Sequence, residues 1–336
     1  MLRKRNTKII ATLGPTSSSP IKIHSLFQAG ADIFRLNFSH GTHNDHKRKV
    51  FHIRQYEKRL GRPIAILGDL QGPKIRIGTF KNNSVVLRNG QKFILDLNPK
   101  PGDEKRVLLP HPEIFKSVKK NTQILIDDGK IILNIINTNS SSITTEIVNG
   151  GKISNMKGVN IPETFIKMSS LTKKDIKDLE FCLDLSLDYV ALSFVQKAKD
   201  LTDLKKYIGD KTGIMAKFEK PLAIKRMDEI LNYSDAAMVA RGDLGVEMPP
   251  EEVPIIQKRI VQACRDHGKP VVVATQMLDS MVNSPSPTRA EASDVATAVF
   301  DAADCLMLSA ETASGKFPVD SVKIMDRIIR GVESDI

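Results

Sequence analysis

The chain contains no tryptophan, few aromatic residues and only three cysteines in 336 residues. Aromatic side chains make up 5% of the sequence and do not interleave with Lys or Arg, which argues against a base-stacking surface for nucleic acid. Cys182, Cys264 and Cys305 are too few and too scattered for a disulfide framework or a zinc site, and they indicate buried thiols in a reducing compartment. The sequence also lacks an apolar run of the roughly 18 residues that a membrane span needs, and its basic start has too short an apolar stretch for a signal peptide. We therefore expect a cytoplasmic protein that binds neither nucleic acid nor membranes.

Positive charge is concentrated in the first half of the chain. The formal net charge is +11; residues 1–60 carry 12 basic and 3 acidic side chains, whereas residues 161–336 carry 23 and 28. Such an asymmetry is typical of proteins that bind nucleic acid or a polyphosphate ligand. The low aromatic content favours the polyphosphate ligand.

Eight short apolar runs alternate with amphipathic segments along the chain. Continuous apolar runs, as opposed to alternating ones, are typical of parallel strands that are buried on both faces. The runs lie at 8–13, 32–37, 64–69, 189–195, 213–219, 236–240, 270–275 and 305–308. Eight strand–helix units over this length predict an α/β protein with a (β/α)8, or TIM, barrel, and a doubly wound open sheet is the alternative.

Capping signals mark the starts of several of the intervening helices. Ser19 and Pro20 suit an N-cap followed by a first-turn proline. Thr172 with Asp175, and Thr288 with Glu291, have the spacing of capping boxes. These signals support helices between the predicted strands.

One segment breaks the alternation of strands and helices. From about residue 77 to 159 apolar and polar residues alternate, and turn signals at Asn89-Gly90, Asp128-Gly129 and Asn149-Gly150 separate the runs. This pattern predicts a small all-β domain inserted after the third barrel strand, at the barrel face where active sites lie, so that it could act as a lid. The expected organisation is a first barrel part at 1–76, the β-rich lid domain at 77–159 and a second barrel part at 160–336.

Charged side chains follow the predicted strands at their carboxyl ends, where barrel enzymes place their active sites. Glu219 and Asp243 lie at neighbouring strand ends and suit a hard divalent cation such as Mg²⁺, although ion pairs at the barrel rim are the alternative. Lys217 lies two residues before Glu219 and therefore points to the same side of its strand. A lysine beside a metal can stabilise charge on a transferring phosphoryl group, and the alternative is a structural ion pair with Glu219.

Further basic residues, and one segment with two glycines, follow other predicted strands. Arg35, His40 and Arg76 would supply the cations that a phosphate site needs. The glycines of the segment 241–245 would let backbone N–H groups approach a small anion.

These segments resemble the pyruvate kinase family, in family order and across nearly the whole chain. The matching segments are TKIIATLGPTS (7–17), FRLNFSHG (34–41), GDLQGPKIR (68–76), IDDG (126–129), DYVALSFV (188–195), AKFEK (216–220), MVARGDLGVE (238–247), KPVVVATQMLDSM (269–281), PTRAEASDVATAV (287–299) and MLSAETASGKFP (307–318). The barrel of that family is also interrupted by a small β domain after strand three. The resemblance implies glycolytic transfer of phosphate from phosphoenolpyruvate to ADP, giving pyruvate and ATP, with Mg²⁺ or Mn²⁺ as the cofactor.

The resemblance also implies a role for each matching residue. Lys217 would stabilise the phosphoryl and enolate charge, Glu219 and Asp243 would ligate the divalent metal, and Arg35 and Arg76 would hold phosphate. The substrate carboxylate would meet the backbone of the residues that follow the sixth strand, which are Ala240, Arg241, Gly242 and Asp243. Thr275 would contact the same carboxylate and belong to the relay that protonates the enolate.

Two further sets of residues match family positions for nucleotide and for a monovalent cation. The nucleotide contacts would be Asn37, His40, Arg76 and Lys197. The monovalent-cation ligands would be Asn37, Ser39, Asp69 and the carbonyl of Leu70. Lys74 stands where K⁺-dependent members have Glu, and its ammonium can supply the single charge that K⁺ supplies elsewhere, so we expect no K⁺ requirement. The alternative is that Lys74 is only a basic residue at the hinge of the lid.

The sequence ends shortly after the predicted last barrel helix at 319–332. Family members usually continue with a C-terminal α/β domain that holds the allosteric site and one of two subunit interfaces. We therefore expect no effector regulation through such a domain, and a homodimer through segment 287–299 rather than a tetramer. Three other functions remain open: an inactive ligand-binding paralogue, a lyase or aldolase acting on phosphoenolpyruvate or pyruvate, and a basic partner of nucleic acid.

Overall fold

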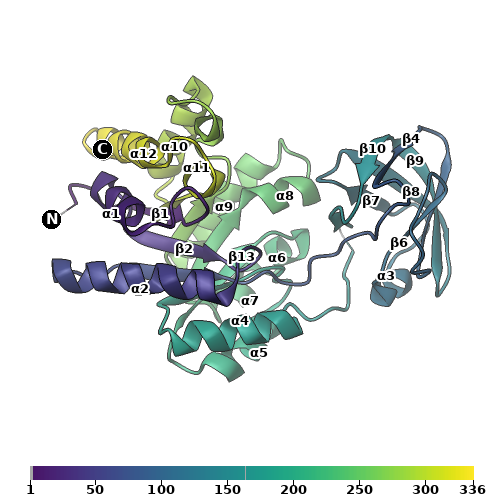
Figure 1. Ribbon diagram of the computed structural model, residues 1–336, viewed down its shortest axis with the longest axis horizontal. Coiled ribbons are helices and arrows are strands. Elements are labelled where there is room, and N and C mark those ends of the chain that lie inside the picture. The colour runs from purple at the N-terminus through teal and green to yellow at the C-terminus, as the bar shows by residue number, and fades with distance from the viewer. Residues whose placement is uncertain (1–2, 163) are drawn as a thin grey trace.

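The structure is a computed structural model, and it describes residues 3–162 and 164–336. In these residues eight parallel strands close into a barrel, helices surround the barrel, and a β domain stands beside it (Figure 1). The order around the barrel is β1-β2-β3-β12-β13-β14-β15-β16, and β1 pairs with both β2 and β16. Closure confirms the predicted TIM barrel and excludes the open sheet.

The barrel strands coincide with the eight apolar runs. They are β1 (Lys8–Thr12), β2 (Ile33–Asn37), β3 (Ala65–Asp69), β12 (Tyr189–Leu192), β13 (Gly213–Phe218), β14 (Ala236–Ala240), β15 (Val271–Ala274) and β16 (Cys305–Leu308). The surrounding helices are α1 (Pro20–Ala29), α2 (His43–Leu60), α4 (Lys173–Asp184), α5 (Ala198–Ile208), α6 (Pro221–Lys225), α7 (Met227–Leu231), α8 (Arg241–Glu247), α9 (Val253–Asp266), α10 (Arg289–Phe300), α11 (Ala310–Ala313) and α12 (Pro318–Glu333). The predicted caps are present: Ser19 accepts from the backbone of Lys22, and Thr172 and Thr288 each form a capping box.

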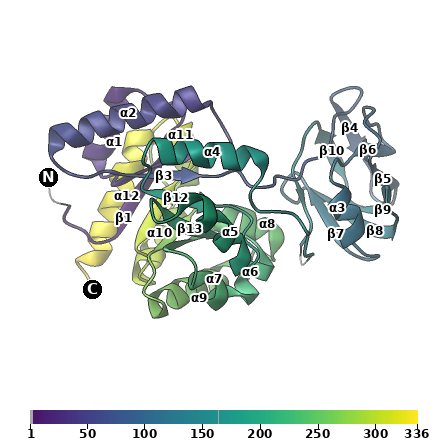
Figure 2. The same ribbon diagram turned by 90° about the horizontal axis from the view of Figure 1, so that it is seen from below.

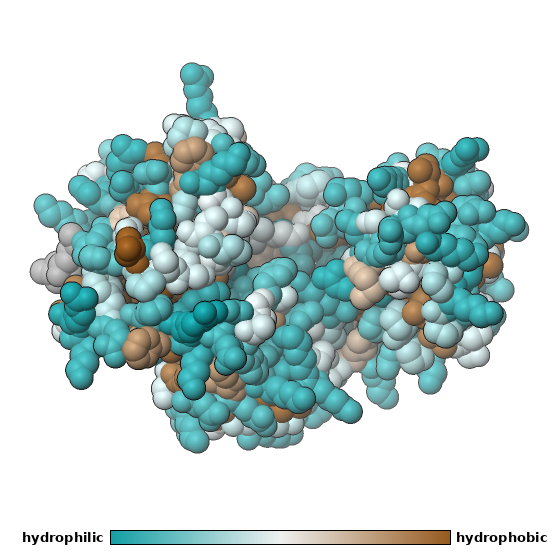
Figure 3. Space-filling model, in the orientation of Figure 1, coloured by the Kyte–Doolittle hydropathy of each residue, from teal (hydrophilic) through white to brown (hydrophobic). Residues whose placement is uncertain are grey.

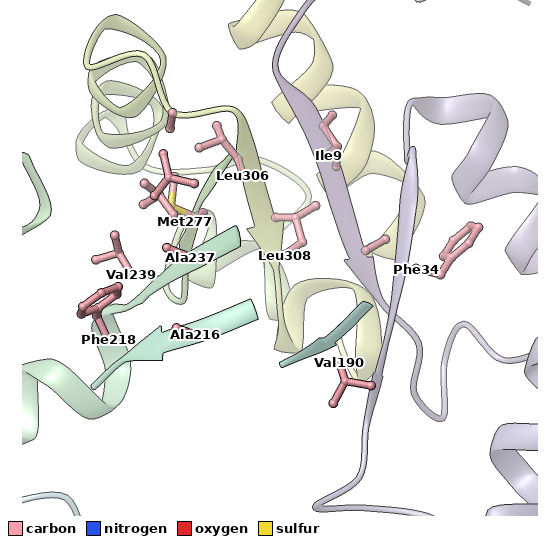
Figure 4. Close-up of a cluster of buried hydrophobic side chains, with 14 of the residues drawn as sticks. Ile9, Phe34, Val190, Ala216, Phe218, Ala237, Val239, Met277, Leu306 and Leu308 are labelled. Carbon is pink, nitrogen blue, oxygen red and sulfur yellow. The ribbon is translucent and has the colours of Figure 1, made fainter. Parts of the chain in front are cut away.

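Alternate residues of each barrel strand enter two different cores. On β1, Ile9 packs outward against the helices, whereas Ile10 packs inside the barrel. On β13, Ala216 and Phe218 join the outer core (Figure 4). Met215, which lies between Ile214 and Ala216 on the same strand, joins the inner core. This double burial is why the strands are continuously apolar. It also means that the residue two positions beyond an inner core residue points toward the mouth of the barrel.

The segment between β3 and α4 forms the β domain. Its elements are β4 (Ser84–Leu87), β5 (Lys92–Asp96), β6 (Arg106–Leu108), α3 (Pro112–Ser117), β7 (Gln123–Ile126), β8 (Ile131–Thr138), β9 (Ser142–Asn149), β10 (Gly151–Ser154) and β11 (Val159–Asn160). A six-stranded sheet has the order β11-β7-β8-β9-β5-β6, and β10 pairs with β4. These strands enclose a core of their own around Phe93, Ile124 and Leu133. The predicted β insertion thus also contains the short helix α3.

Two of the predicted turns have different outcomes. Asp128-Gly129 closes a true hairpin, because β7 and β8 pair antiparallel. Asn89-Gly90 joins β4 to β5, but these strands lie in different sheets, since β4 pairs with β10 and β5 pairs with β6 and β9. The turn signal therefore marked the change of direction correctly without indicating the partner strand.

The β domain is set apart from the barrel and joined to it by two crossings of the chain (Figure 2). At its base, Arg76 and Gly158 form an isolated antiparallel bridge. Asn160 Nδ2 donates a hydrogen bond of 2.7 Å to Glu247 Oε1 on α8 of the barrel.

The face of the molecule in Figure 3 is largely hydrophilic with scattered apolar residues. Among the described residues, no helix has both the length and the apolarity to cross a membrane.

Candidate active site

A ring of polar side chains lies at the carboxyl end of the barrel. Each member stands two positions beyond a residue that faces the inside of the barrel, for example Lys217 after Met215 and Asp69 after Leu67. The members are Thr12, Arg35, Asp69, Ser193 and Lys217. The strand period of two therefore positions the site, and the closed barrel brings residues from five strands or strand ends together.

Lys217 is the centre of this ring. Its Nζ lies 2.7 Å from Glu219 Oε1 and 3.2 Å from Asp69 Oδ1, and it donates a hydrogen bond of 2.7 Å to Ser193 Oγ. Burial by itself would lower the pKa of Lys217, but the two carboxylates hold that pKa above its ordinary value. Lys217 is therefore a fixed positive charge at the mouth.

Asp69 is shared by two cations. Arg35 Nε donates to Asp69 Oδ2 at 2.7 Å, and Arg35 Nη1 donates to Thr12 Oγ1 at 3.1 Å. Burial opposes ionisation of Asp69, yet Lys217 and Arg35 hold the pKa of this carboxyl below its ordinary value. The arrangement fixes both cations in place and leaves Arg35 partly exposed toward the mouth.

Glu219 and Asp243 supply further carboxylate oxygens whose charges act on Lys217. Glu219 is 1% exposed; its Oε2 accepts a hydrogen bond of 2.8 Å from the backbone of Phe194, while Oε1 has no hydrogen-bond donor and only the ion pair with Lys217. Burial raises the pKa of Glu219 against the effect of Lys217, and Asp243 raises it further. Asp243 lies in the first turn of α8, is exposed, and forms no hydrogen bond or ion pair with any described residue.

These two carboxylates fit a hard divalent cation. Carboxylate oxygens are the donor type that Mg²⁺ prefers. The described residues contain no group of three or more His, Cys, Asp or Glu that could enclose a metal ion. A cation at Glu219 and Asp243 would thus need further oxygen ligands from a bound substrate or water.

The end of β15 has an unusual backbone. Thr275 and Gln276 have φ values of +78° and +55°, which residues other than glycine rarely adopt. Gly242 fits closely against Thr275, since a Cβ at Gly242 would lie 2.8 Å from Thr275 Cγ2. The guanidinium of Arg241 is directed to the carbonyl oxygen of Thr275 and to Asp294, so only the backbone of Arg241 remains available to a ligand.

A pocket of about 830 Å³ opens beside the ring. It lies between the loop after β1, the end of β2, the first half of α2 and the start of α11, and three of its lining residues are the predicted phosphate and nucleotide ligands Arg35, Asn37 and His40. Burial and then the nearby cations Lys74, Arg35 and Arg76 lower the pKa of His40. The further lining residues include Thr12, Pro15, Ser19, Asp45, His46, Lys49, His52 and Ser309.

Other predicted residues lie outside this pocket. Arg76 Nη1 donates to the carbonyl of Met156 at 2.7 Å, at the base of the β domain. Lys197 Nζ lies 5.2 Å from the centre of the Phe165 ring. Neither of these two predicted nucleotide ligands lines the pocket, although the charge of Arg76 acts on His40.

The predicted monovalent-cation ligands already have protein partners. Asn37 Oδ1 accepts from the backbone of Ser39 at 3.0 Å, and the Leu70 carbonyl accepts from Ser193 Oγ at 2.8 Å. Lys74 has no hydrogen-bond or ion-pair partner among the described side chains. Desolvation holds the pKa of Lys74 below its ordinary value, and the negative charge of Asp243 opposes this effect.

Thr12, Ser193 and Lys49 are among the residues of the site that the sequence-based prediction did not include. The first two could have been found from strand period, because each lies two positions beyond an inward-facing residue, Ile10 or Ala191. Lys49 had no such signal. It resembles any basic residue on an amphipathic helix, and only the structure shows that it is buried against the pocket.

Fold and site together define a (β/α)8-barrel protein with a lysine–carboxylate centre suited to phosphoryl transfer. The family model for the barrel domain of pyruvate kinase matches residues 4–322. Pyruvate kinases from Methylorubrum extorquens and Agrobacterium vitis are 52% and 53% identical over 335 and 330 residues, covering 100% and 98% of this chain and 70% of each relative. A crystal structure of a pyruvate kinase from Cryptosporidium parvum has a TM-score of 0.96 at 36% identity, covering 99% of this chain and 70% of that one. The chain belongs to the pyruvate kinase family.

Proposed function

We propose that this chain transfers the phosphoryl group of phosphoenolpyruvate to ADP and releases pyruvate and ATP. The observation that carries the proposal is the buried ammonium of Lys217, held 2.7 Å from Glu219 and 3.2 Å from Asp69 at the barrel mouth. Family membership supports the same reaction. The residues whose loss would favour an inactive paralogue, Arg35, Lys217, Glu219 and Asp243, are all present.

The charges of the site suit the charges that develop during the transfer. The transferring phosphoryl group and the enolate that it leaves are both anionic, so a fixed ammonium stabilises them without reorganisation. Lys217 supplies this ammonium, and Arg35 supplies a guanidinium that can hold phosphate by paired N–H groups. A divalent cation held by Glu219 and Asp243, Mg²⁺ or Mn²⁺, would neutralise further negative charge on the phosphate oxygens.

The residues at the ends of β14 and β15 would orient the substrate. The first turn of α8, from Arg241, has backbone N–H groups without acceptors in their own helix, as any helix start does, and these groups would receive the substrate carboxylate. Thr275, which touches Gly242 of that turn, would contact the same carboxylate and take part in protonation of the enolate. We further propose that the β domain acts as a lid over the mouth and excludes water when it closes.

Pyruvate formation tests the proposal directly. Purified chain is incubated with phosphoenolpyruvate, ADP and Mg²⁺, and pyruvate is measured by its reduction with NADH and lactate dehydrogenase. We expect pyruvate to form only when all three components are present. Pyruvate formation without ADP, or none in the complete mixture with a folded chain, would contradict the proposal.

The pocket of about 830 Å³ is the proposed nucleotide site, and Lys49 on its wall gives a specific prediction. Lys49 is 8% exposed, has no partner among the described side chains, and has its pKa lowered by burial. A buried ammonium without a partner is costly, so an acceptor oxygen of the nucleotide is its expected partner. We expect Lys49→Met to raise the KM for ADP about 10-fold, which corresponds to about 1.4 kcal/mol.

The KM for phosphoenolpyruvate should stay within about twofold in Lys49→Met, because the lost contact belongs to the nucleotide. Lys47→Met is the matched control, since Lys47 lies on the same helix but is exposed and does not line the pocket. Steady-state kinetics with each substrate varied in turn measure both constants. An equal KM for ADP in the two variants would contradict a nucleotide contact by Lys49.

Lys74 is the proposed replacement for a potassium ion. Burial lowers the pKa of Lys74 and the charges of Asp243 and Glu219 oppose that change, so its ammonium lies within electrostatic range of the active-site carboxylates. We expect the activity of the chain in K⁺-free buffer to lie within about twofold of its activity with K⁺. Lys74→Glu reverses the charge, and its activity should rise about 10-fold or more when K⁺ is added, which is roughly 1.4 kcal/mol of restored electrostatic stabilisation.

Lys81→Glu is the control for this charge reversal, because Lys81 is exposed on the β domain and pairs with Asp103. It should leave the response to K⁺ unchanged. A K⁺ requirement of the unmodified chain would leave the phosphoryl transfer in place and refute the proposal that Lys74 replaces K⁺.

Assembly as a homodimer through segment 287–299, which includes most of α10, stays a prediction.

A further inference from the structure

Arg241 turns its side chain away from the barrel mouth and toward the end of β15. Its Nε and Nη2 donate hydrogen bonds of 3.2 and 2.7 Å to the carbonyl oxygen of Thr275. Its Nη1 and Nη2 lie 2.8 and 2.7 Å from the two oxygens of Asp294 on α10. The side chain of Arg241 is 12% exposed. The guanidinium therefore connects α10 to one specific peptide carbonyl of the active site.

Two more acceptors complete the surroundings of this guanidinium. Gln257 Oε1 on α9 lies 3.3 Å from Nη1, and Met277 Sδ lies 2.9 Å from Nη2. The five N–H groups of an arginine are thus all directed at protein acceptors. Arg241 has no N–H group left with which its side chain could bind a substrate.

Thr275, whose carbonyl oxygen accepts these hydrogen bonds from Arg241, has a strained backbone. Thr275 is β-branched and has a φ of +78°, a region that β-branched residues rarely enter, and Gln276 follows with a φ of +55°. Such conformations persist only where neighbouring groups hold them, and they often occur at functional sites. Two neighbours hold Thr275: Arg241 fixes its carbonyl oxygen, and Gly242 leaves room for its methyl group.

We propose that Arg241 is a positioning residue for Thr275. Two hydrogen bonds on the Thr275 carbonyl fix the plane of the peptide that joins Thr275 to Gln276. Fixing that plane prevents the backbone from relaxing out of its left-handed conformation, and it thereby keeps the Thr275 side chain directed at the substrate. Asp294 orients Arg241 in turn from the neighbouring helix. The proposal rests on the function assigned above, in which Thr275 contacts the carboxylate and serves enolate protonation.

A purely structural bridge between β14 and β15 would behave differently. Such a bridge would weaken the fold and affect each step to a similar degree, whether or not Thr275 has its hydroxyl. A positioning residue affects only the steps that use Thr275. A double-mutant cycle separates the two, because the effect of changing Arg241 should depend on the residue at position 275 only if Arg241 acts through it.

The cycle uses Arg241→Lys, Thr275→Ala and the double variant. Lysine retains the charge beside Asp294 but cannot reproduce the paired N–H groups on the carbonyl. We expect Arg241→Lys to lower kcat about 10- to 100-fold, the range for a misplaced reacting group, with the KM for ADP within about twofold. In the Thr275→Ala background the same change should alter kcat less than about twofold. The proposal would be overturned if Arg241→Lys lowered kcat by the same factor in the unmodified chain and in the Thr275→Ala chain. An unchanged kcat in Arg241→Lys would also overturn it.

A second measurement isolates the proton-transfer step. Exchange of the pyruvate methyl protons with deuterium in ²H₂O, followed by ¹H NMR, reports enolate formation and protonation without ADP turnover. We expect Arg241→Lys to slow this exchange by the factor seen in kcat. Unchanged exchange together with a reduced kcat would place the defect elsewhere and would also overturn the proposal.

Asp294→Asn provides a second variant, and Lys258→Met provides the control. Asp294→Asn keeps the size of the group that orients Arg241, and it can replace Arg241→Lys in the same cycle if that protein does not fold. Lys258 pairs with Asp301 at the end of α10 and so also joins α9 to the α10 region, but it does not touch Thr275. Lys258→Met should leave kcat and exchange unchanged. An inactive unmodified chain would refute the proposed function itself, whereas an active chain with an additive cycle would refute only the role of Arg241.

Discussion

Replacement of Lys217 by Met should lower kcat by about 1,000-fold or more, the effect expected when a preorganised charge at the reacting group is lost. Met has nearly the same length as Lys and fills the same buried space, so the lost ammonium is the principal change. The ammonium contacts Asp69, Glu219 and Ser193, and no other described lysine does so. Without it, negative charge would develop beside two carboxylates with less compensation.

The measurement is kcat for pyruvate formation at saturating phosphoenolpyruvate and ADP, with circular dichroism to establish that the variant is folded. The binding of Mn²⁺ should persist, because Glu219 and Asp243 remain. Lys199→Met is a suitable control, since Lys199 is exposed and pairs only with Asp203 on its own helix. A folded Lys217→Met protein with more than a tenth of the original kcat would refute the assigned role of Lys217.

Replacement of Glu219 by Gln should weaken divalent-metal binding about 10- to 100-fold and lower kcat about 100-fold or more at low metal concentration, the loss typical of a disturbed metal site. Gln keeps an oxygen that can accept the hydrogen bond from the Phe194 backbone, so the local fold should be preserved. The negative charge that attracts the cation is removed. Titration with Mn²⁺, followed by its electron paramagnetic resonance signal, measures the affinity without turnover.

Glu311→Gln is a closely matched control for this variant. Glu311 is also 1% exposed and accepts hydrogen bonds from the backbones of Leu278 and Ser309, but it has no lysine partner and no part in the proposed metal site. The Glu311→Gln protein should bind Mn²⁺ with the same affinity as the unmodified chain. Equal Mn²⁺ affinities of Glu219→Gln and the unmodified chain would exclude Glu219 as a metal ligand.

The barrel could be predicted from sequence because its physical signals are local. Burial on both faces makes each strand continuously apolar, and capping boxes such as Thr172 with Asp175 are complete within four residues. The period of two also predicted that Lys217 and Glu219 would share one side, and the ion pair of 2.7 Å agrees with that prediction.

Long-range contacts were not predictable in the same way. A strand-end position indicates where the backbone of Arg241 lies, but the direction of its side chain depends on Asp294, which is 53 residues away in sequence. The Asn89-Gly90 turn likewise gave no indication that β4 would pair with β10. Lys49 lacked any signal for its burial, because the wall opposite it comes from loops after β1 and β16. Helix and strand patterns record local burial, whereas these features depend on how distant elements meet.

The fate of the phosphorus atom distinguishes phosphoryl transfer to ADP from every other reaction of phosphoenolpyruvate. Phosphoenolpyruvate, ADP and Mg²⁺ are mixed with the chain in a K⁺-free Tris buffer, and ³¹P NMR follows each phosphate. We expect the phosphoenolpyruvate signal to be replaced in equal amount by the γ-phosphate signal of ATP. Release of the phosphorus as inorganic phosphate, or an unchanged phosphoenolpyruvate signal with folded protein and added K⁺, would contradict it.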